Sequence, residues 1–339
     1  MKWLLRAAVA AAIVGALWGL SYVLHEHVIE YVVRIAMLCG MNIILAVGLN
    51  LINGTTGQFS IGHAGFMAVG AYTTAYVCTQ LAPEVAGVLG TGFLPDAVVF
   101  NVGLIAGAAL AAATGVVVGV PSLRLKGDYL AIVTLGFGEI IRLLLTNAEF
   151  LGGATGFSGD NPTGLSPYTN VFWVFLWVVI VIVVIRNVTF SQTGRSLEAI
   201  SEDEIAAEAM GTPTTRLKVV AFTLSAAAAG IAGGLFAHLQ GSVRPDDFKF
   251  DRSIDMIVMI IVGGLGSITG AVIGGIFVGV TLELMRDLSE YRLVLYSLLL
   301  VIIMLVRPQG VLGKRELSFS RLFPKKAAKP ARAAGDEKP

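Results

Sequence analysis

Long uncharged apolar runs alternate with short polar connections along most of this chain. Two of these runs are "VVFNVGLIAGAALAAATGVVVGV" at residues 98–120 and "VFWVFLWVVIVIVVI" at residues 171–185. A helix needs about 20 mostly apolar residues to cross the hydrocarbon core of a bilayer, whereas a spanning β-strand alternates polar and apolar positions. The runs do not alternate, so the pattern predicts membrane-spanning helices. We place apolar segments at residues 7–24, 28–52, 58–79, 98–120, 129–146, 170–186, 218–240, 250–264, 267–285 and 292–306.

The low charge content supports this prediction. Only 14% of the residues are charged and the mean hydropathy is +0.79, whereas roughly a quarter of the residues of a soluble protein are charged. The sequence therefore predicts an all-α, polytopic membrane protein with about ten transmembrane helices. Eight helices plus a re-entrant pair are the alternative, because segment 250–264 is short and a glycine-rich turn divides it from segment 267–285.

The basic loops indicate which side faces the cytoplasm, since short loops rich in Lys and Arg stay there. The loop "RLKGD" after the fourth segment and the C-terminal tail are basic, whereas loops 80–97 and 147–169 contain no Lys or Arg. An even number of crossings then places both termini in the cytoplasm. We divide the chain into a transmembrane domain at residues 1–310 and a basic tail at residues 311–339, which we expect to be disordered.

The cytoplasmic loop at residues 187–217 is unusually acidic for so apolar a chain. Ser201 and Glu204 have the spacing of a capping box, and Gly211 favours a left-handed helix end. The spacing predicts two short helices that are joined at Ser201 and end at Gly211. The carboxylates of this loop are Glu198, Glu202, Asp203, Glu204 and Glu208.

Two interpretations of this loop are open: a solvated loop resting on lipid headgroups, or a docking element for another protein. Apolar positions such as Ile205 and Met210 would be left uncovered in a lone loop. The cytoplasmic leaflet is anionic and attracts basic rather than acidic segments. A pair of small-residue helices ringed by acids fits a groove in a soluble partner better, so the charge pattern favours docking.

Several motifs resemble one family of transporters. Gly194-Arg195, Ala199-Ile200, Ala206-Ala207 and Gly211 resemble the coupling loop of permease subunits in ATP-binding-cassette importers, most closely those of the branched-chain (hydrophobic) amino-acid uptake family. The stretches "GLNLINGTTGQFSIGHAGFMAVGAY", "GDYLAIVTLGFGEIIRLLLTN" and "VGGLGSITGAVIGG" resemble further signatures of this family, in the same order. Together they cover about residues 40–310.

This resemblance implies a type II importer-like permease in a bacterial inner membrane that moves branched-chain or other hydrophobic amino acids. It implies two cytoplasmic ATPase subunits, a second related permease and an external binding protein as partners, with no nucleic acid. The chain is then no enzyme and carries no cofactor, in line with the lack of a G-x-x-x-x-G-K-[ST] motif. The predicted coupling residues are Gly194, Arg195, Glu198, Ala199, Ile200, Glu202, Glu204, Ala206, Ala207 and Gly211. The three carboxylates follow from the acid pattern, and the others follow from the resemblance. Ser201 departs from the family pattern, because relatives often carry a basic residue there.

Three other functions are alternatives to amino-acid import. The first is a permease for urea or short amides, which relatives of similar pattern carry. An ion-coupled secondary transporter would need a carboxylate near the midplane, for which Glu139 is the main candidate. A membrane enzyme would need a catalytic His/Asp/Glu cluster, and the spacing of these residues offers none.

Polar residues inside the apolar segments are the remaining candidates. They face other helices or a wet cavity, because an unpaired amide in hydrocarbon is costly. Bonding between helices and a translocation path are the two interpretations. The possible path residues are Asn42, Asn50, Asn53, Gln58, Ser60 and His63. Glu139 and Arg142 are three apart, the spacing of a charge pair on one helix face. No metal site is indicated.

One internal similarity involves two of the glycine-rich stretches. Residues 52–71 align with residues 261–280 so that four glycines of one match four of the other. The orientation above makes both stretches run in the same direction. A parallel internal repeat of this kind is known in transporter architecture.

Overall fold

The computed structural model describes residues 14–19, 21, 29–90, 92–125, 127–158, 165–286, 291–307, 309–313 and 316. A helix occupies each expected segment from 28–52 onward, while segment 7–24 lies mostly outside the described residues. The longer helices are α2 (Glu30–Asn50), α3 (His63–Leu89), α4 (Phe93–Ser122), α5 (Asp128–Asn147), α6 (Val171–Thr189), α9 (Thr214–Gln240), α10 (Phe250–Gly263), α11 (Ile268–Leu284) and α12 (Arg292–Val306). Shorter helical segments are the π turn Leu51–Thr55, α7 (Gln192–Glu202), α8 (Glu204–Ala209) and the 3-10 turns Glu149–Leu151, Gly153–Thr155 and Pro245–Phe248.

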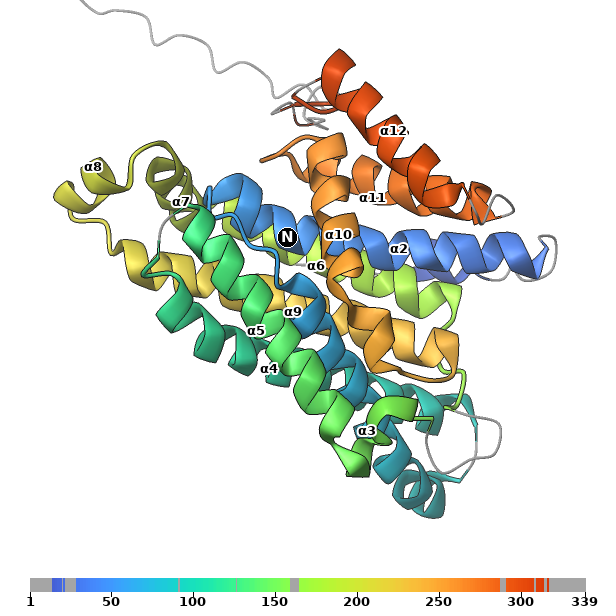
Figure 1. Ribbon diagram of the computed structural model, residues 1–339. Coiled ribbons are helices and arrows are strands. Elements are labelled where there is room, and N and C mark those ends of the chain that lie inside the picture. Colours follow the sequence, from blue (N-terminus) through green and yellow to red (C-terminus); the bar gives the residue numbers. More distant parts are fainter. Residues whose placement is uncertain are drawn as a thin grey trace, which may run out of the picture.

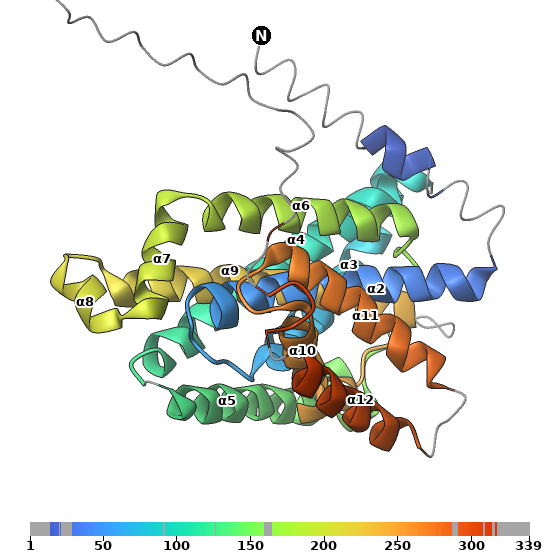
Figure 2. The same cartoon turned by 90° about the horizontal axis from the view of Figure 1, so that it is seen from above.

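The helix lengths fit a polytopic membrane protein. Five stretches are long and apolar enough to cross a bilayer: Glu30–Thr55, Phe93–Ser122, Asp128–Asn147, Val171–Thr189 and Thr214–Gln240. Ile268–Leu284 and Val294–Ile303 are apolar but shorter. Figures 1 and 2 show α2, α6 and α9 running roughly along one direction, and Figure 1 shows α10 crossing α2 steeply. The all-α prediction is thus confirmed for the part of the chain that the structure describes.

Helices α3, α4 and α9 pack closely against one another. Glycines allow their backbones to approach closely. Gly70 of α3 lies directly against Gly230 of α9, and Gly230 in turn lies against the backbone of Gly107 in α4. Gly233, one turn along α9, lies against the Met67 carbonyl. A side chain at these glycines has no room, so the sequence pattern of α3 and α9 sets their separation.

The two glycine-rich stretches that align in sequence meet in space. The first spans the π turn, the loop 56–62 and the start of α3, and the second spans the end of α10, the break and most of α11. Gly54 lies against the backbone of Gly266, and the Asn50 Oδ1 accepts a hydrogen bond from the Gly266 N–H at 2.9 Å. The region between α2 and α3 therefore supplies both a hydrogen-bond acceptor and a packing surface for the break between α10 and α11.

Helices α7 and α8 project beyond one end of the bundle, which we call the α7–α8 end (Figures 1 and 2). Two residues join α6 to α7, and four residues, including Gly211 with a φ of +84°, join α8 to α9. Gly194 lies against the Thr189 backbone, so the corner between α6 and α7 is tight. The predicted pair of short helices and the left-handed end at Gly211 are confirmed.

The predicted capping box at Ser201 is wrong. Ser201 lies inside α7, and its hydroxyl donates to the Glu198 carbonyl at 2.7 Å. The cap of α8 is Asp203, whose carboxylate accepts from the N–H groups of Ile205 and Ala206 at 2.9 and 3.0 Å. Asp203 adopts an extended conformation (φ −154°, ψ 107°), which aims its side chain at these amides. The helix joint is therefore two residues later than expected.

Candidate functional site

The two short helices bury one face and expose the other. Leu197 and Ile200 of α7 are 0% and 3% exposed, and Ala207 of α8 is buried as well. The buried face is anchored on the end of the bundle, because α7 contacts α6, α9 and the π turn. The two helices are thus a fixed projection rather than a free loop.

The exposed surface of this projection combines large apolar side chains with acids. Ile205 is 73% exposed and Met210 is 86% exposed, although burying either side chain would be favourable by about 1.5–3 kcal/mol. The exposed carboxylates are Glu198, Glu202, Asp203 and Glu208. Exposed apolar residues rimmed by polar ones are typical of a protein interaction site.

The predicted coupling residues fall into an exposed and a buried set. The exposed set is Arg195, Glu198, Ala199, Glu202, Ala206 and Gly211, and the buried set is Gly194, Ile200 and Ala207. Glu204 belongs to neither set fully. Its side chain is 23% exposed and forms a 2.7 Å ion pair with Lys218, whose side chain is only 1% exposed. Lys218 lies in the second turn of α9, so this pair ties α8 to α9.

A cleft of about 560 Å³ lies between α7 and the body of the bundle. Its walls come from distant parts of the chain: α7, the end of the π turn, the break between α10 and α11, and the segment after α12. The charged residues that line it are Arg195, Glu198, Glu202 and Glu316. A displacement of α7 toward or away from the bundle would change the size of this cleft.

Two of the predicted path residues bind across helices. The Asn42 Oδ1 accepts a hydrogen bond from the Arg252 guanidinium of α10 at 3.3 Å. Asn50 accepts from the Gly266 N–H in the break between α10 and α11. Both asparagines are buried, so they join α2 to the α10–α11 pair.

The other predicted path residues lie around the break between α2 and α3. Asn53 and Ser60 bond reciprocally: the Asn53 amide donates to the Ser60 carbonyl at 3.3 Å and accepts from the Ser60 N–H at 3.2 Å. The Gln58 amide donates to the Thr56 carbonyl at 3.5 Å. His63 is 1% exposed, and its ring nitrogens have no hydrogen-bond partner among the described residues. The Asn53, Ser60 and Gln58 contacts are local to the turn between α2 and α3, and a role of these residues in translocation stays a prediction.

Glu139 and Arg142 lie on a partly exposed flank of α5. The Arg142 Nε donates to the Glu139 Oε2 at 2.7 Å, and the side chains are 21% and 34% exposed for Arg142 and Glu139. This i,i+3 contact hides part of both charges within the helix. No group of three or more His, Cys, Asp or Glu residues in the described part of the chain is placed to hold a metal ion.

Sequence reasoning did not single out Lys218 or Glu316 as site residues. Lys218 is the only charged residue after Arg216 in the α9 sequence, and a Lys at the edge of an apolar span is ordinarily interpreted as an interfacial anchor. Glu316 lies in the segment assigned to the tail. Its carboxylate instead accepts hydrogen bonds at the start of α11, a contact that no local pattern indicates.

Comparison of the sequence with known proteins assigns the chain to a family. Residues 31–306 match the family described as the branched-chain amino acid transport system permease component. The LivM high-affinity branched-chain amino acid transport system permease proteins of Salmonella typhimurium and Escherichia coli K12 are each 40% identical to this chain over 313 residues, covering 83% of this chain and 69% of the relative. The LivH permease protein of Escherichia coli K12 is 24% identical over 290 residues, covering 81% of this chain and 92% of the relative.

No solved structure matches this chain. The family assignment therefore stands on the sequence match, which spans α2 to α12, and agrees with a helical bundle that carries a projecting helix pair between α6 and α9. The chain belongs to the family of branched-chain amino acid transport system permease components.

Proposed function

We propose that this chain is the membrane-spanning subunit of an ATP-driven importer of branched-chain amino acids, with ATP hydrolysis on separate subunits. The observation that carries the proposal is the match to this permease family in a chain whose α7–α8 projection exposes Ile205 and Met210 among acids. A secondary transporter has no need of such a projection. The carboxylate candidate for ion coupling, Glu139, is engaged with Arg142.

The α7–α8 projection is the element on which an ATPase would act. It is joined to α6 and α9 through short connections and to α9 again through the Glu204–Lys218 ion pair. A partner that binds ATP and closes against the projection would favour one arrangement of these helices over another. Outward-open and inward-open states are then two populations whose ratio depends on the nucleotide.

The same proposal covers the partners and the location. Two ATPase subunits, a second related permease and an external binding protein complete the importer, in the inner membrane of a bacterium with both termini in the cytoplasm. Escherichia coli K12 contains both LivM and LivH among the relatives, which supports a pairing of two related permeases. The basic loop at Arg124 and Lys126 supports this orientation.

Reconstitution tests the function directly. The chain is placed in vesicles with its partner subunits, and uptake of labelled leucine is measured with and without ATP while ion gradients are held constant. We expect uptake to require ATP and to be inhibited by isoleucine and valine but not by urea. Uptake that persists without ATP and follows an ion gradient would support the secondary transporter instead, and inhibition by urea would support the urea or amide permease.

The exposed apolar side chains of α8 give a second test. We expect Ile205→Asp and Met210→Asp each to lower ATP-driven uptake by about tenfold or more, because a charge would enter a desolvated contact. The conservative variant Met210→Leu keeps the apolar surface and should retain uptake. The measurement is uptake together with recovery of the ATPase subunits on the purified permease. Normal recovery and uptake in both Asp variants would exclude a docking role for this face.

A further inference from the structure

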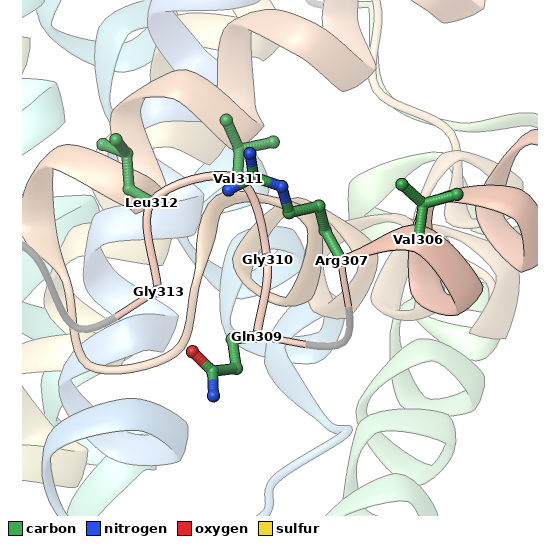
Figure 3. A pocket seen from close by; sticks show the side chains of 7 residues that line it. All are labelled: Val306, Arg307, Gln309, Gly310, Val311, Leu312 and Gly313. Carbon is green, nitrogen blue, oxygen red and sulfur yellow. The ribbon is translucent and has the colours of Figure 1, made fainter.

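The segment after α12 crosses the break between α10 and α11. Residues 309–313, which we call the strap together with Glu316, run beside this break (Figure 3). The Val311 N–H donates to the Val262 carbonyl at 2.8 Å, and the Leu312 N–H donates to the Gly263 carbonyl at 3.2 Å. These carbonyls belong to the last turn of α10. No N–H group of α10 itself can donate to them, because the helix ends there. The strap therefore satisfies the end of α10.

Glu316 satisfies the beginning of α11. Its carboxylate accepts from the Ile268 N–H at 2.5 Å, from the Thr269 N–H at 3.3 Å and from the Thr269 hydroxyl at 2.7 Å. The first N–H groups of a helix lack intrahelical acceptors, and the helix dipole favours a negative charge there. One segment thus binds both helix ends that the break leaves open.

The fit between the strap and the break is close. Gly310 and Gly313 lie against the backbone of Gly264, and a Cβ atom on Gly264 would come within 2.6 Å of the Gly313 carbonyl oxygen. All three glycines have positive φ values, between +56° and +117°, a region that residues with a side chain rarely adopt. The backbone contact is therefore built for this position and is not an accidental touch of a tail.

Glu316 also faces the α7–α8 projection. It lines the cleft beneath α7 together with Arg195, Glu198 and Glu202. The Arg195 guanidinium is exposed and donates to the Phe190 carbonyl at 3.4 Å. Closure of this cleft brings α7 toward the carboxylate that fixes α11. A single side chain thus lies at the junction of the projection and the α10–α11 pair.

We propose that the strap is a clip that holds the α10–α11 break, and that Glu316 is a positioning residue through which movement of α7 reaches α11. This inference rests on the proposed function and adds to it, because the strap lies outside residues 31–306, the part that matches the family. In this arrangement the α7–α8 projection acts on two routes: α8 acts on α9 through the Glu204–Lys218 ion pair, and α7 acts on α11 through Glu316.

The test compares Glu316→Ala and Glu316→Asp with Glu283→Gln. Glu283 pairs with Arg286 near the other end of α11, at 3.0 Å, and serves as the matched control. Amide exchange of Ile268 and Thr269 is measured in the full complex, and so is the number of leucine molecules taken up per ATP hydrolysed. We expect Glu316→Ala to speed exchange of both amides by about tenfold or more and to lower uptake per ATP by about fivefold. Glu316→Asp should recover part of both, and Glu283→Gln should change neither.

Each outcome bears on one part of the proposal. Unchanged exchange in Glu316→Ala would show that the clip does not form. Faster exchange with unchanged uptake per ATP would reduce Glu316 to a structural cap and overturn its role in coupling. Failure of the proposed function is distinguishable from both, because the unaltered complex would then show no ATP-dependent leucine uptake at all.

Discussion

Replacing Glu204 by alanine is expected to loosen α8 from α9 at a cost of roughly 3 kcal/mol, since removing one partner strands the other as a buried charge. The stranded group is the Lys218 ammonium, whose side chain is 1% exposed. Hydrogen exchange of the α8 amides and ATP-driven uptake measure the effect. We expect exchange throughout α8 to accelerate and uptake to fall, because α8 loses the ion pair that ties it to α9.

The reverse change should be milder, which makes the prediction specific. Lys218→Met leaves the Glu204 carboxylate, which is 23% exposed and therefore reachable by water, so the expected cost is only about 1 kcal/mol. The double variant Glu204→Leu/Lys218→Met should be more stable than Glu204→Ala alone. Glu208→Ala, an exposed carboxylate on the same helix, is the matched control and should leave α8 protected. If Glu204→Ala behaves like Glu208→Ala, the ion pair does not hold the projection.

Replacing Gly70 by alanine is expected to destabilise the packing of α3 against α9. A Cβ atom at this position would overlap the backbone of Gly230, and backbone cannot move aside as a flexible side chain does. Overpacking of this kind typically costs about 1–3 kcal/mol or more, because α3 and α9 must separate. We expect a lower melting temperature in detergent and a lower yield of folded protein.

Gly87 provides the matched control for Gly70 on the same helix. A Cβ atom there meets nothing within 4 Å, and alanine has a higher helix propensity than glycine by about 1 kcal/mol. Gly87→Ala should therefore be neutral or slightly stabilising. Equal melting temperatures for the two variants would contradict the close packing of α3 against α9.

The helices of this bundle were predictable because apolar run length determines them, but their ends were not. The expected segment 170–186 is α6, which continues to Thr189 although Arg186 and Asn187 are polar. Apolarity ends where the membrane ends, whereas the hydrogen-bonded helix continues into the polar region. The expected segment 58–79 begins instead at His63 and reaches Leu89, since the loop 56–62 is shaped by its contacts with neighbouring helices.

The candidate site was predictable in kind but not in its connections. The acid content indicated a projecting helix pair, and the structure contains one. The pairing of Glu204 with Lys218 depends on the turn at Gly211, which brings α9 back alongside α8. The cap at Asp203 depends on a backbone conformation that the Ser201–Glu204 spacing does not encode. The contact of Glu316 with α11 joins residues nearly fifty positions apart, beyond the range of any local pattern.

The short connections of α7 to α6 and of α8 to α9 determine how a displacement of the projection is distributed between α6 and α9. Two residues join α6 to α7 and four join α8 to α9. Connections this short are not flexible enough to absorb a displacement of the projection. A displacement of the projection therefore moves both flanking helices, which differ in how well they are packed: 28% of the apolar stretch of α6 is buried, against 67% for α9. A helix with few buried contacts is displaced more easily than a helix that is packed against several neighbours. We therefore expect α6 to change its tilt more than α9, which stays nearly fixed and acts as the pivot.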